Sequence, residues 1–338
     1  MEIRLNSIIN LVKKEFIFFV VLILAIFSCL FVKPSLSYLD YIDWKTIVIL
    51  FIMMIFVQVL NNVGIFDRLI NALLDKVNSS RSLVFVLVFI CFFSSIFITN
   101  DIALLTFVPF SIIALKKVNL EYLVIITVVL QTIAANMGSM ILPIGSPHNI
   151  FMYSISGISF KSFIVLLLPY VIISFIFLII CCLFIKSENI EVSVSNFNKS
   201  EETSFFMRIF SGVDYFLLLT FIGLFILIGN LQNIPEVIGF FKSIIVGNEL
   251  FCGIIASQFI SNVPAGMVLS GFSNNYELII VGINIGGLGT LIASMANLIS
   301  YKLFVNEFNN LKFKYLAVFS ILNVILLIIL FVFYFITN

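Results

Sequence analysis

One stretch near the middle of the chain combines the surroundings of a membrane helix with residues that no regular helix tolerates. The apolar run 121–135 leads directly into segment 136–149, which has Pro143, Gly145 and Pro147 at alternate positions. Each proline removes an N–H donor and fixes φ, and the glycine lets the backbone leave helical space. The segment is therefore predicted to be unwound. In a bilayer, unwound backbone is tolerated only where protein buries it or where it lines a polar cavity, so 136–149 is a candidate binding site.

The composition around this stretch limits the class of protein. Of 338 residues, 62% are hydrophobic and 10% are charged, and the mean hydropathy is +1.23. That leaves too little polar surface for a soluble globule, and the apolar runs have the length of membrane helices. The net charge of +1, without a basic stripe, argues against a nucleic-acid partner. The sequence predicts an all-α polytopic membrane protein surrounded by membrane lipid.

The apolar runs divide the chain into an N-terminal helix, two halves and a polar linker. The expected segments are an N-terminal scaffold helix in 1–42, a first half in 43–185, a cytoplasmic linker in 186–212 and a second half in 213–338. Each half contains a re-entrant hairpin, at 82–115 or 250–275, followed by a broken helix, at 121–154 or 276–304. The arms of the second hairpin have about eleven residues, or about 16 Å of helix, and are too short to cross a bilayer. Segment 65–77 is amphipathic and is expected to lie along the membrane interface.

The two halves align with each other. Placing Asp43 on Asp214 also places Leu60 on Leu231 and Asn62 on Asn233, and after a loop deletion Thr99-Asn100 pairs with Ser261-Asn262. Allowing for a shorter second loop, the alignment continues with four further pairs: Asn136 with Asn284, Gly138 with Gly286, Ser146 with Ser294, and Asn149 with Asn297. The first copy starts outside the membrane and the second inside, which predicts an inverted-topology repeat with its site at mid-membrane.

The positive charges set the orientation of this arrangement. Of the 18 lysines and arginines, all but four fall on one face of the topology, and the exceptions are Lys33, Lys45, Lys161 and Lys242. By the positive-inside rule the N-terminus is cytoplasmic and the C-terminus is outside. The expected location is the cytoplasmic (inner) membrane of a bacterium.

Two hairpins and two broken helices bring helix termini to one small volume, where N-termini favour anions and C-terminal carbonyls favour cations. The expected substrate-binding residues are Thr99, Asn100, Ser146, Asn149, Ser261, Asn262, Ser294 and Asn297. The expected ion-coupling residues are Asn100, Asp101, Asn136, Gly138, Asn262, Asn284 and Gly286. Na⁺ is expected at Asn100/Gly138 and at Asn262/Gly286. The alternative for any single Asn or Ser is a hydrogen bond that joins membrane helices.

Two titratable residues, Asp101 and His148, each have two alternative roles. Asp101 is a proton carrier or cation ligand on one interpretation and an N-terminal helix cap on the other. His148, the one histidine, either shuttles a proton or hydrogen-bonds to backbone, and the latter is favoured. Enzyme motifs such as HExxH, a Walker loop or a His and Cys cluster are absent from the sequence. The chain is therefore predicted not to be an enzyme and to need no cofactor beyond a coupling ion.

At these residues the chain resembles the ion transporter superfamily of divalent anion/sodium symporters (INDY type), citrate carriers, arsenite permeases and NhaD-type antiporters. The resemblance covers most of 43–336 and is carried by segments 98–109, 135–149, 261–264 and 284–286. In INDY-type members two Ser-Asn-Thr tips bind carboxylate and Na⁺, and the matching positions are 99–101 and 261–263. Asp101 and Val263 depart from that pattern and lack the hydroxyl that would meet a dicarboxylate. The resemblance implies an elevator mechanism, usually in a homodimer, with 65–77 as an interfacial helix.

The sequence therefore predicts a secondary active transporter of a small anion, a carboxylate such as citrate or an oxyanion, coupled to Na⁺ or H⁺. A Na⁺/H⁺ antiporter is the first alternative, favoured by Asp101 and by the lack of Lys and Arg in the predicted core. A passive anion channel of the same fold is the second.

Overall fold

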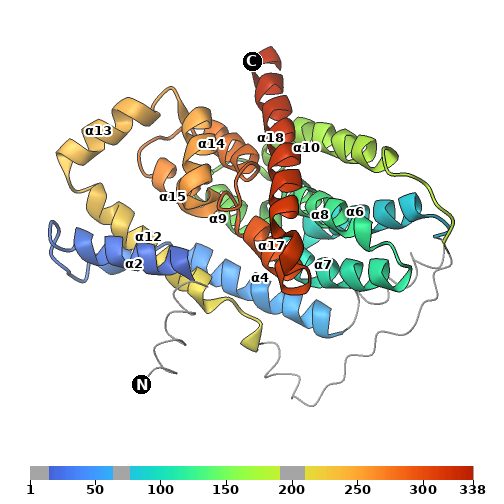
Figure 1. Ribbon diagram of the computed structural model, residues 1–338. Coiled ribbons are helices and arrows are strands. Elements are labelled where there is room, and N and C mark those ends of the chain that lie inside the picture. The colour runs from blue at the N-terminus through green and yellow to red at the C-terminus, as the bar shows by residue number, and fades with distance from the viewer. Residues whose placement is uncertain (1–14, 64–76, 191–209, 338) are drawn as a thin grey trace.

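The computed structural model describes residues 15–63, 77–190 and 210–337 (Figure 1). Every regular element among these residues is a helix, and one isolated antiparallel bridge pairs Ser79 with Asn189. The expected all-α class is confirmed. The predicted interfacial segment 65–77, apart from Val77, and most of the predicted linker 186–212 lie outside the described residues.

The first half of the chain contains a helical hairpin followed by an interrupted helix, close to the predicted bounds. Its elements are α2 (Phe16–Ser28), α3 (Tyr38–Tyr41), α4 (Trp44–Asn62), α6 (Ser80–Phe97), α7 (Asn100–Lys117), η1 (Glu121–Leu123), α8 (Val124–Gly138), η2 (Pro143–Gly145), α9 (Pro147–Ser156) and α10 (Phe160–Leu183). The hairpin turns at Ile98 and Thr99, where the polar triplet predicted a bend.

The second half repeats this order. Its elements are α12 (Tyr215–Leu231), α13 (Pro235–Ile245), α14 (Glu249–Ile260), α15 (Asn262–Ser270), α16 (Tyr276–Gly286), α17 (Met295–Glu307), η3 (Asn309–Leu311) and α18 (Lys312–Thr337). Asp214 caps α12 by accepting a hydrogen bond from the Leu217 N–H. Helix α13 does not appear among the segments expected from the sequence, and it leaves α12 at a bend of 106°.

The break in the first interrupted helix is shorter than predicted. Helix α8 continues through Asn136 to Gly138, and α9 begins at Pro147, so 139–146 alone lies outside α-helix. The physical reason is that proline fits the first position of a helix, where its missing N–H would have no intrahelical partner. Pro147 therefore starts a helix, although the sequence analysis took it as part of the unwound segment. The second break, at 287–294, falls within the predicted range.

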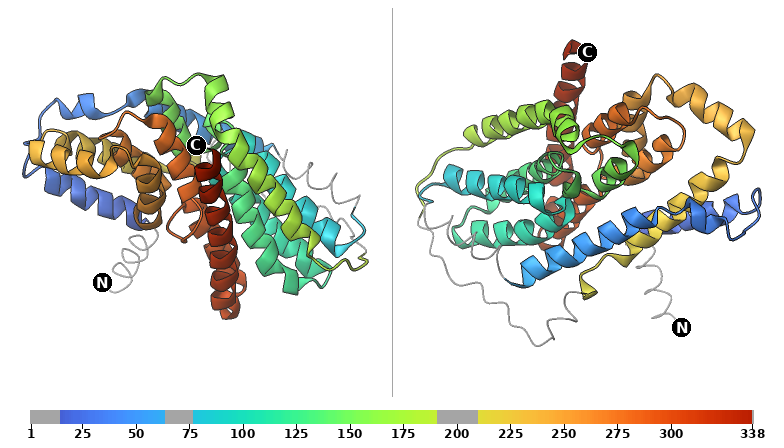
Figure 2. Two further views of the ribbon diagram at one scale, coloured as in Figure 1. Left: turned by 90° about the horizontal axis from the view of Figure 1, so that it is seen from above. Right: turned by 180° about the vertical axis from the view of Figure 1, so that it is seen from behind.

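The hairpins and interrupted helices pack in two matching sets. Helix α6 lies along α8, and α14 lies along α16 (Figures 1 and 2). Across the halves, α7 packs against α17 and α9 packs against α15. Each interrupted helix thus places its first part on the hairpin of its own half and its second part on the hairpin of the other half.

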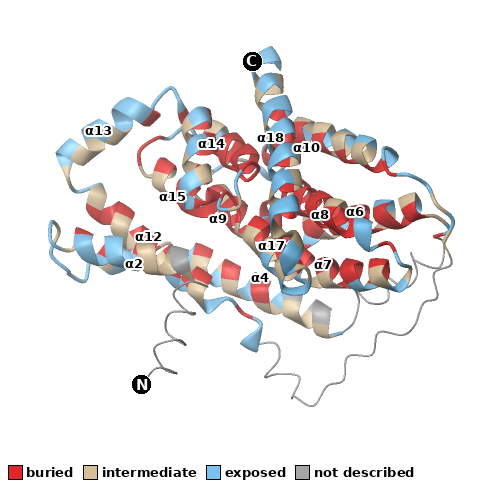
Figure 3. Ribbon diagram, in the orientation of Figure 1, coloured by how far each residue is buried: buried red, intermediate tan, exposed pale blue. Residues whose placement is uncertain are grey.

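The outer helices expose apolar side chains. Burial is greatest on α8, α15 and α16, whereas α10, α13 and α18 carry large exposed faces (Figure 3). The exposed residues of α18 include Ile321, Ile325, Ile328 and Val332. Among the described residues, four helices are long and apolar enough to cross a bilayer, and a fifth is added if the bent pair α12 and α13 is counted as one span. This surface is that of a multi-pass membrane protein.

Candidate functional site

The turns of the two hairpins are buried and differ in backbone conformation. Thr99 precedes α7 with extended dihedral angles, φ −66° and ψ 147°. Ser261 precedes α15 with φ 71° and ψ 153°, a combination that residues with a side chain seldom adopt. The Asn262 N–H donates to the Ala293 carbonyl at 2.9 Å, so the second turn is held against the break between α16 and α17. Strain of this kind is maintained only where surrounding structure fixes it.

Four helices begin at one narrow cleft. The residues that line the cleft are Asn100, Asp101, Pro147, His148, Leu217, Asn262, Val263, Ser294 and Met295. They include the first residues of α7, α9, α15 and α17, while Leu217 comes from the first turn of α12. The space inside is about 10 Å³, which is the volume for about one water-sized group. Among these described lining residues none is Lys or Arg, so the positive potential comes from helix N-termini.

Asn136 joins residues from both halves beside this cleft. Its Oδ1 accepts from Asn100 Nδ2 at 3.0 Å and from Ser294 Oγ at 3.2 Å. Its Nδ2 donates to Asn297 Oδ1 at 2.8 Å. Asn297 in turn donates to the carbonyls of Gly287 and Thr290, both at 3.0 Å, in the second break. The structure therefore brings together four of the predicted site residues, Asn100, Asn136, Ser294 and Asn297.

Asn284 has the matching position in the second half. It exchanges hydrogen bonds with Asn149, donating at 2.7 Å and accepting at 3.2 Å. Its Oδ1 also lies 3.2 Å from His148 Nε2, which is 3.2 Å from Ser146 Oγ. The pairs Asn136–Asn297 and Asn149–Asn284 thus both cross between halves. His148 thus bonds to two polar side chains, whereas the sequence analysis favoured a bond to backbone.

Three buried oxygens at the hairpin turns have no hydrogen-bond partner among the described residues: Asn100 Oδ1, Asp101 Oδ1 and Ser261 Oγ. Buried polar atoms are normally paired, so such a cluster indicates atoms that meet a ligand. Groups of three or more His, Cys, Asp or Glu side chains that could hold a metal ion do not occur in the described part of the chain. The unpartnered atoms are amide, carboxylate and hydroxyl oxygens, the kind of ligand that hard cations prefer.

Two glycines and two serines that occupy equivalent positions bring each interrupted helix close to its hairpin. A Cβ at Gly138 would collide with the Phe92 carbonyl oxygen and with Ser95 Oγ. A Cβ at Gly286 would lie 2.8 Å from Ser257 Oγ. The structure therefore shows Gly138 and Gly286 in packing contacts with α6 and α14. The sequence analysis missed Ser95 and Ser257, although both stand four positions before the aligned residues Thr99 and Ser261.

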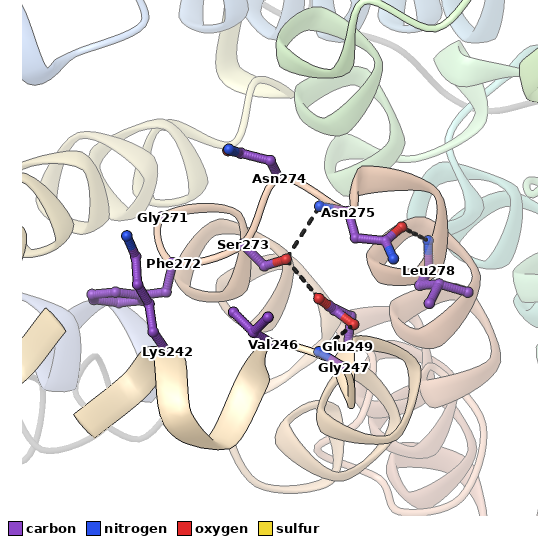
Figure 4. A pocket seen from close by; sticks show the side chains of 10 residues that line it. All are labelled: Lys242, Val246, Gly247, Glu249, Gly271, Phe272, Ser273, Asn274, Asn275 and Leu278. Carbon is purple, nitrogen blue, oxygen red and sulfur yellow. Dashed lines mark hydrogen bonds between the residues drawn. The ribbon is translucent and has the colours of Figure 1, made fainter. Parts of the chain in front are cut away.

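A larger hollow lies at the opposite end of the second hairpin. It has a volume of about 600 Å³ and is lined by residues of α13, the start of α14 and the α15–α16 loop (Figure 4). Buried Glu249 accepts from the Gly247 N–H at 3.1 Å and from Ser273 Oγ at 2.8 Å. Both carboxylate oxygens are thus used to join the α13–α14 turn to the α15–α16 loop. The arrangement is a structural anchor, and the predicted residues are absent from its lining.

Comparison with known proteins agrees with this architecture. The family model described as "Citrate transporter" matches residues 7–274. The chain belongs to the citrate transporter family. It is 32% identical to an uncharacterized transporter of Methanocaldococcus jannaschii over 78% of this chain and 81% of that protein. It is 28% identical to the inner membrane protein YbiR of Escherichia coli over 78% of this chain and 80% of that protein.

A more distant relative extends the comparison. The chain is also 29% identical to a Dictyostelium discoideum protein named as a transporter, arsB, over 48% of this chain and 28% of that protein. Family and relatives together identify a secondary transporter of the citrate and arsenite permease type, and not an enzyme.

Proposed function

We propose that the chain moves a small anion, a carboxylate such as citrate or an oxyanion, across the membrane, and that a Na⁺ or H⁺ gradient drives this transport. The observation that carries this proposal is the meeting of four helix N-termini at one cleft. Backbone N–H groups and helix dipoles bind anions without a charged side chain. The unpartnered oxygens of Asn100, Asp101 and Ser261 supply ligands for the cation.

The packing supports an inverted repeat in which hairpins and interrupted helices form the moving body. Equivalent elements make equivalent contacts, and equivalent asparagines bond across the halves. Leu217 lies across the cleft on α12, a helix that we assign to the static scaffold with α2 and α4. The bent helix α13 is the proposed interfacial arm of the second half, and 65–77 is its proposed counterpart.

The narrow cleft implies that an anion binds after the hairpin turns separate. Space for about one water-sized group admits a bare cation but not a carboxylate. Substrate entry therefore requires movement of Asn100 or Asn262 away from the α9 and α17 N-termini. This movement is part of the proposed cycle, and an elevator displacement would follow it.

The same observation favours one second candidate, a Na⁺/H⁺ antiporter. Asp101 lines the cleft, its Oδ1 has no partner among the described residues, and the space suits one small ion. An intramembrane carboxylate that alternately holds Na⁺ and H⁺ would perform this exchange. This function needs no anion.

Flux in proteoliposomes separates the candidates. A Na⁺ gradient and then a proton gradient would be imposed with and without a panel of carboxylates and oxyanions, while charge movement and internal pH are recorded. Signals that need one anion establish the anion carrier and name its substrate. A pH change driven by Na⁺ alone establishes the antiporter, and anion flux that never runs uphill establishes a channel.

The Asn262→Ala variant tests the site itself. Asn262 lies at the second hairpin turn and lines the cleft, so either carrier function is expected to lose transport in this variant while expression stays unchanged. Asn274→Ala, an exposed asparagine of the same half outside the cleft, is the matched control. Normal transport by Asn262→Ala would show that the site lies elsewhere.

A further inference from the structure

The side chain of Gln258 forms hydrogen bonds at the C-terminal end of α16. It lies on α14, one turn before the hairpin tip, and its Nε2 points at three backbone carbonyls. The distances are 2.8 Å to Gly286 O, 3.0 Å to Leu288 O and 3.1 Å to Ile254 O. Its Oε1 accepts from the Thr290 N–H at 2.9 Å. The amide therefore sits inside the second break, held on both its nitrogen and its oxygen.

The break is shaped to accept this side chain. Thr290 Oγ1 donates to the Gln258 carbonyl at 3.0 Å, which adds a second link between the same two residues. Gly289 has φ 103°, and a Cβ at that position would collide with Gln258 Oε1. A glycine is thus required both by the left-handed backbone and by the amide packed against it.

A carbonyl cluster at a helix C-terminus is a place for positive charge. The C-terminus of α16 carries the negative end of the helix dipole; its Ile283, Asn284 and Ile285 carbonyls accept from the Gly287 and Leu288 N–H groups, and its Gly286 carbonyl accepts from Gln258. The sequence analysis expected Na⁺ at Asn262/Gly286 for this reason. The Gln258 nitrogen lies within 3.1 Å of three carbonyl oxygens, Gly286 O at the end of α16, Leu288 O in the break and Ile254 O on α14, and so takes the position that a cation bound to these oxygens would have. The Gln258 amide supplies the partial positive charge itself.

The first half has no equivalent side chain. Aligning Thr99-Asn100 with Ser261-Asn262 places Ile96 opposite Gln258 and Ser95 opposite Ser257. The side chain of isoleucine has no hydrogen-bond donor. The first half instead holds the unpartnered Asn100 Oδ1 and Asp101 Oδ1, and the carboxylate brings a charge that a cation would balance. The two halves are therefore alike in backbone and different in the group that meets the carbonyl end.

We propose that the Gln258 amide permanently replaces a coupling cation in the second half, so that one cation, bound near Asn100 and Asp101, accompanies each transport cycle. This inference rests on the proposed function, because it assigns the coupling ion of that same site. Gln258 acts as a positioning residue that ties the second hairpin to the α16–α17 break in the way an ion would.

Equilibrium binding of ²²Na⁺ to the purified full chain in nanodiscs tests the inference by counting ions. Gln258→Glu exchanges the donor for an oxygen that faces carbonyls, and this variant is expected to bind one more Na⁺ per chain than wild type. Gln232→Glu is the matched control, because Gln232 Nε2 also donates to a backbone carbonyl, that of Gly271, but lies outside the cleft. The control is expected to bind the wild-type number.

A second variant tests the inference if the Gln258→Glu protein does not fold. Gln258→Met keeps the length of the side chain and removes the donor, so Na⁺ is expected to raise its Tm above that in choline, by more than Na⁺ raises the wild-type Tm. Two Na⁺ ions bound to wild type, or no added ion in Gln258→Glu and no added Na⁺ stabilisation in Gln258→Met, would overturn the inference. The ion count does not require flux, so an absence of anion transport would refute the proposed function separately.

Discussion

At the scale of single residues, two helix ends pack closely against neighbouring helices because they end in glycine. Gly138 ends α8 directly against the Phe92 carbonyl and Ser95 Oγ, and Gly286 ends α16 against Ser257. These contacts hold each interrupted helix next to its hairpin and so set the position of the asparagines that follow and precede the breaks. A Cβ at Gly138 would collide with the Phe92 carbonyl oxygen and Ser95 Oγ, whereas the atoms nearest a Cβ at Gly286 would be farther away, Ser257 Oγ at 2.8 Å, Ser257 Cβ at 2.9 Å and the Gly253 carbonyl oxygen at 3.0 Å.

This difference predicts the order in which three Gly→Ala substitutions lower the stability of the protein. Gly138→Ala is expected to cost about 1–3 kcal/mol of stability through overpacking, and Gly286→Ala less, because the nearest atom to its new Cβ is 2.8 Å away, whereas two atoms would lie closer than that to the Cβ of Gly138→Ala. Gly239→Ala is the control, since a Cβ there meets no atom within 4 Å and alanine favours the α13 helix. Thermal unfolding of the purified variants measures the order. Equal Tm values for Gly138→Ala and Gly239→Ala would contradict the packing described here.

At the scale of elements, the sequence was sufficient to predict hairpins and interrupted helices because Pro, Gly and Asn interrupt otherwise continuous apolar runs. It placed both breaks and both turns, and it predicted that Asn136, Asn284 and their partners cluster. It did not predict which asparagines pair, since Asn136–Asn297 and Asn149–Asn284 depend on packing between halves. Helix α13 and the helical start at Pro147 were missed because a short amphipathic helix and a proline-led helix resemble loops in sequence.

The short arms of the second hairpin lead to a prediction about topology. Helices α14 and α15 have 12 and 9 residues, about 18 Å and 14 Å, so neither crosses the hydrocarbon region alone. Cysteines at exposed Asn248 and Asn274 are therefore expected to react with an impermeant maleimide from outside the cell. Cysteines at exposed Asn78 and Asn119, which flank the first hairpin, are expected to react only from the cytoplasm. Labelling of Asn248 and Asn274 from opposite sides would refute the hairpin.

At the scale of the whole molecule, contacts between distant segments agree with one assignment of the two membrane faces. Lys116 Nζ lies 2.6 Å from Glu307 Oε2, joining the ends of α7 and α17 on the face proposed to be cytoplasmic. Gln58 Nε2 donates to the Gly212 carbonyl at 3.0 Å on that same face. Ser154 Oγ donates to Asp43 Oδ2 at 3.2 Å on the opposite face. Each contact joins segments that the lysine and arginine distribution assigns to one side.

This assignment also locates the cleft relative to the scaffold. Leu217 lies in the first turn of α12, next to the capping residue Asp214, and not near the middle of that helix. Because α12 starts at the proposed cytoplasmic face, the moving body in this conformation would stand toward the cytoplasm. An elevator cycle then requires Leu217 and Met295, which face the same cleft here, to separate when the site reaches the outside.

A cross-link between these two positions is expected to stop transport. Leu217→Cys and Met295→Cys would be combined in a chain whose five native cysteines are replaced, and oxidation should abolish flux until a reductant is added. Each single-cysteine variant, oxidised in the same way, is the control and should keep its activity. The arrest follows because the disulfide joins the scaffold helix α12 to the start of α17 in the moving body. Full transport by the oxidised, cross-linked protein would show that the hairpins and interrupted helices do not move past α12, and a fixed-barrier mechanism in which gates open around a stationary site would replace the elevator.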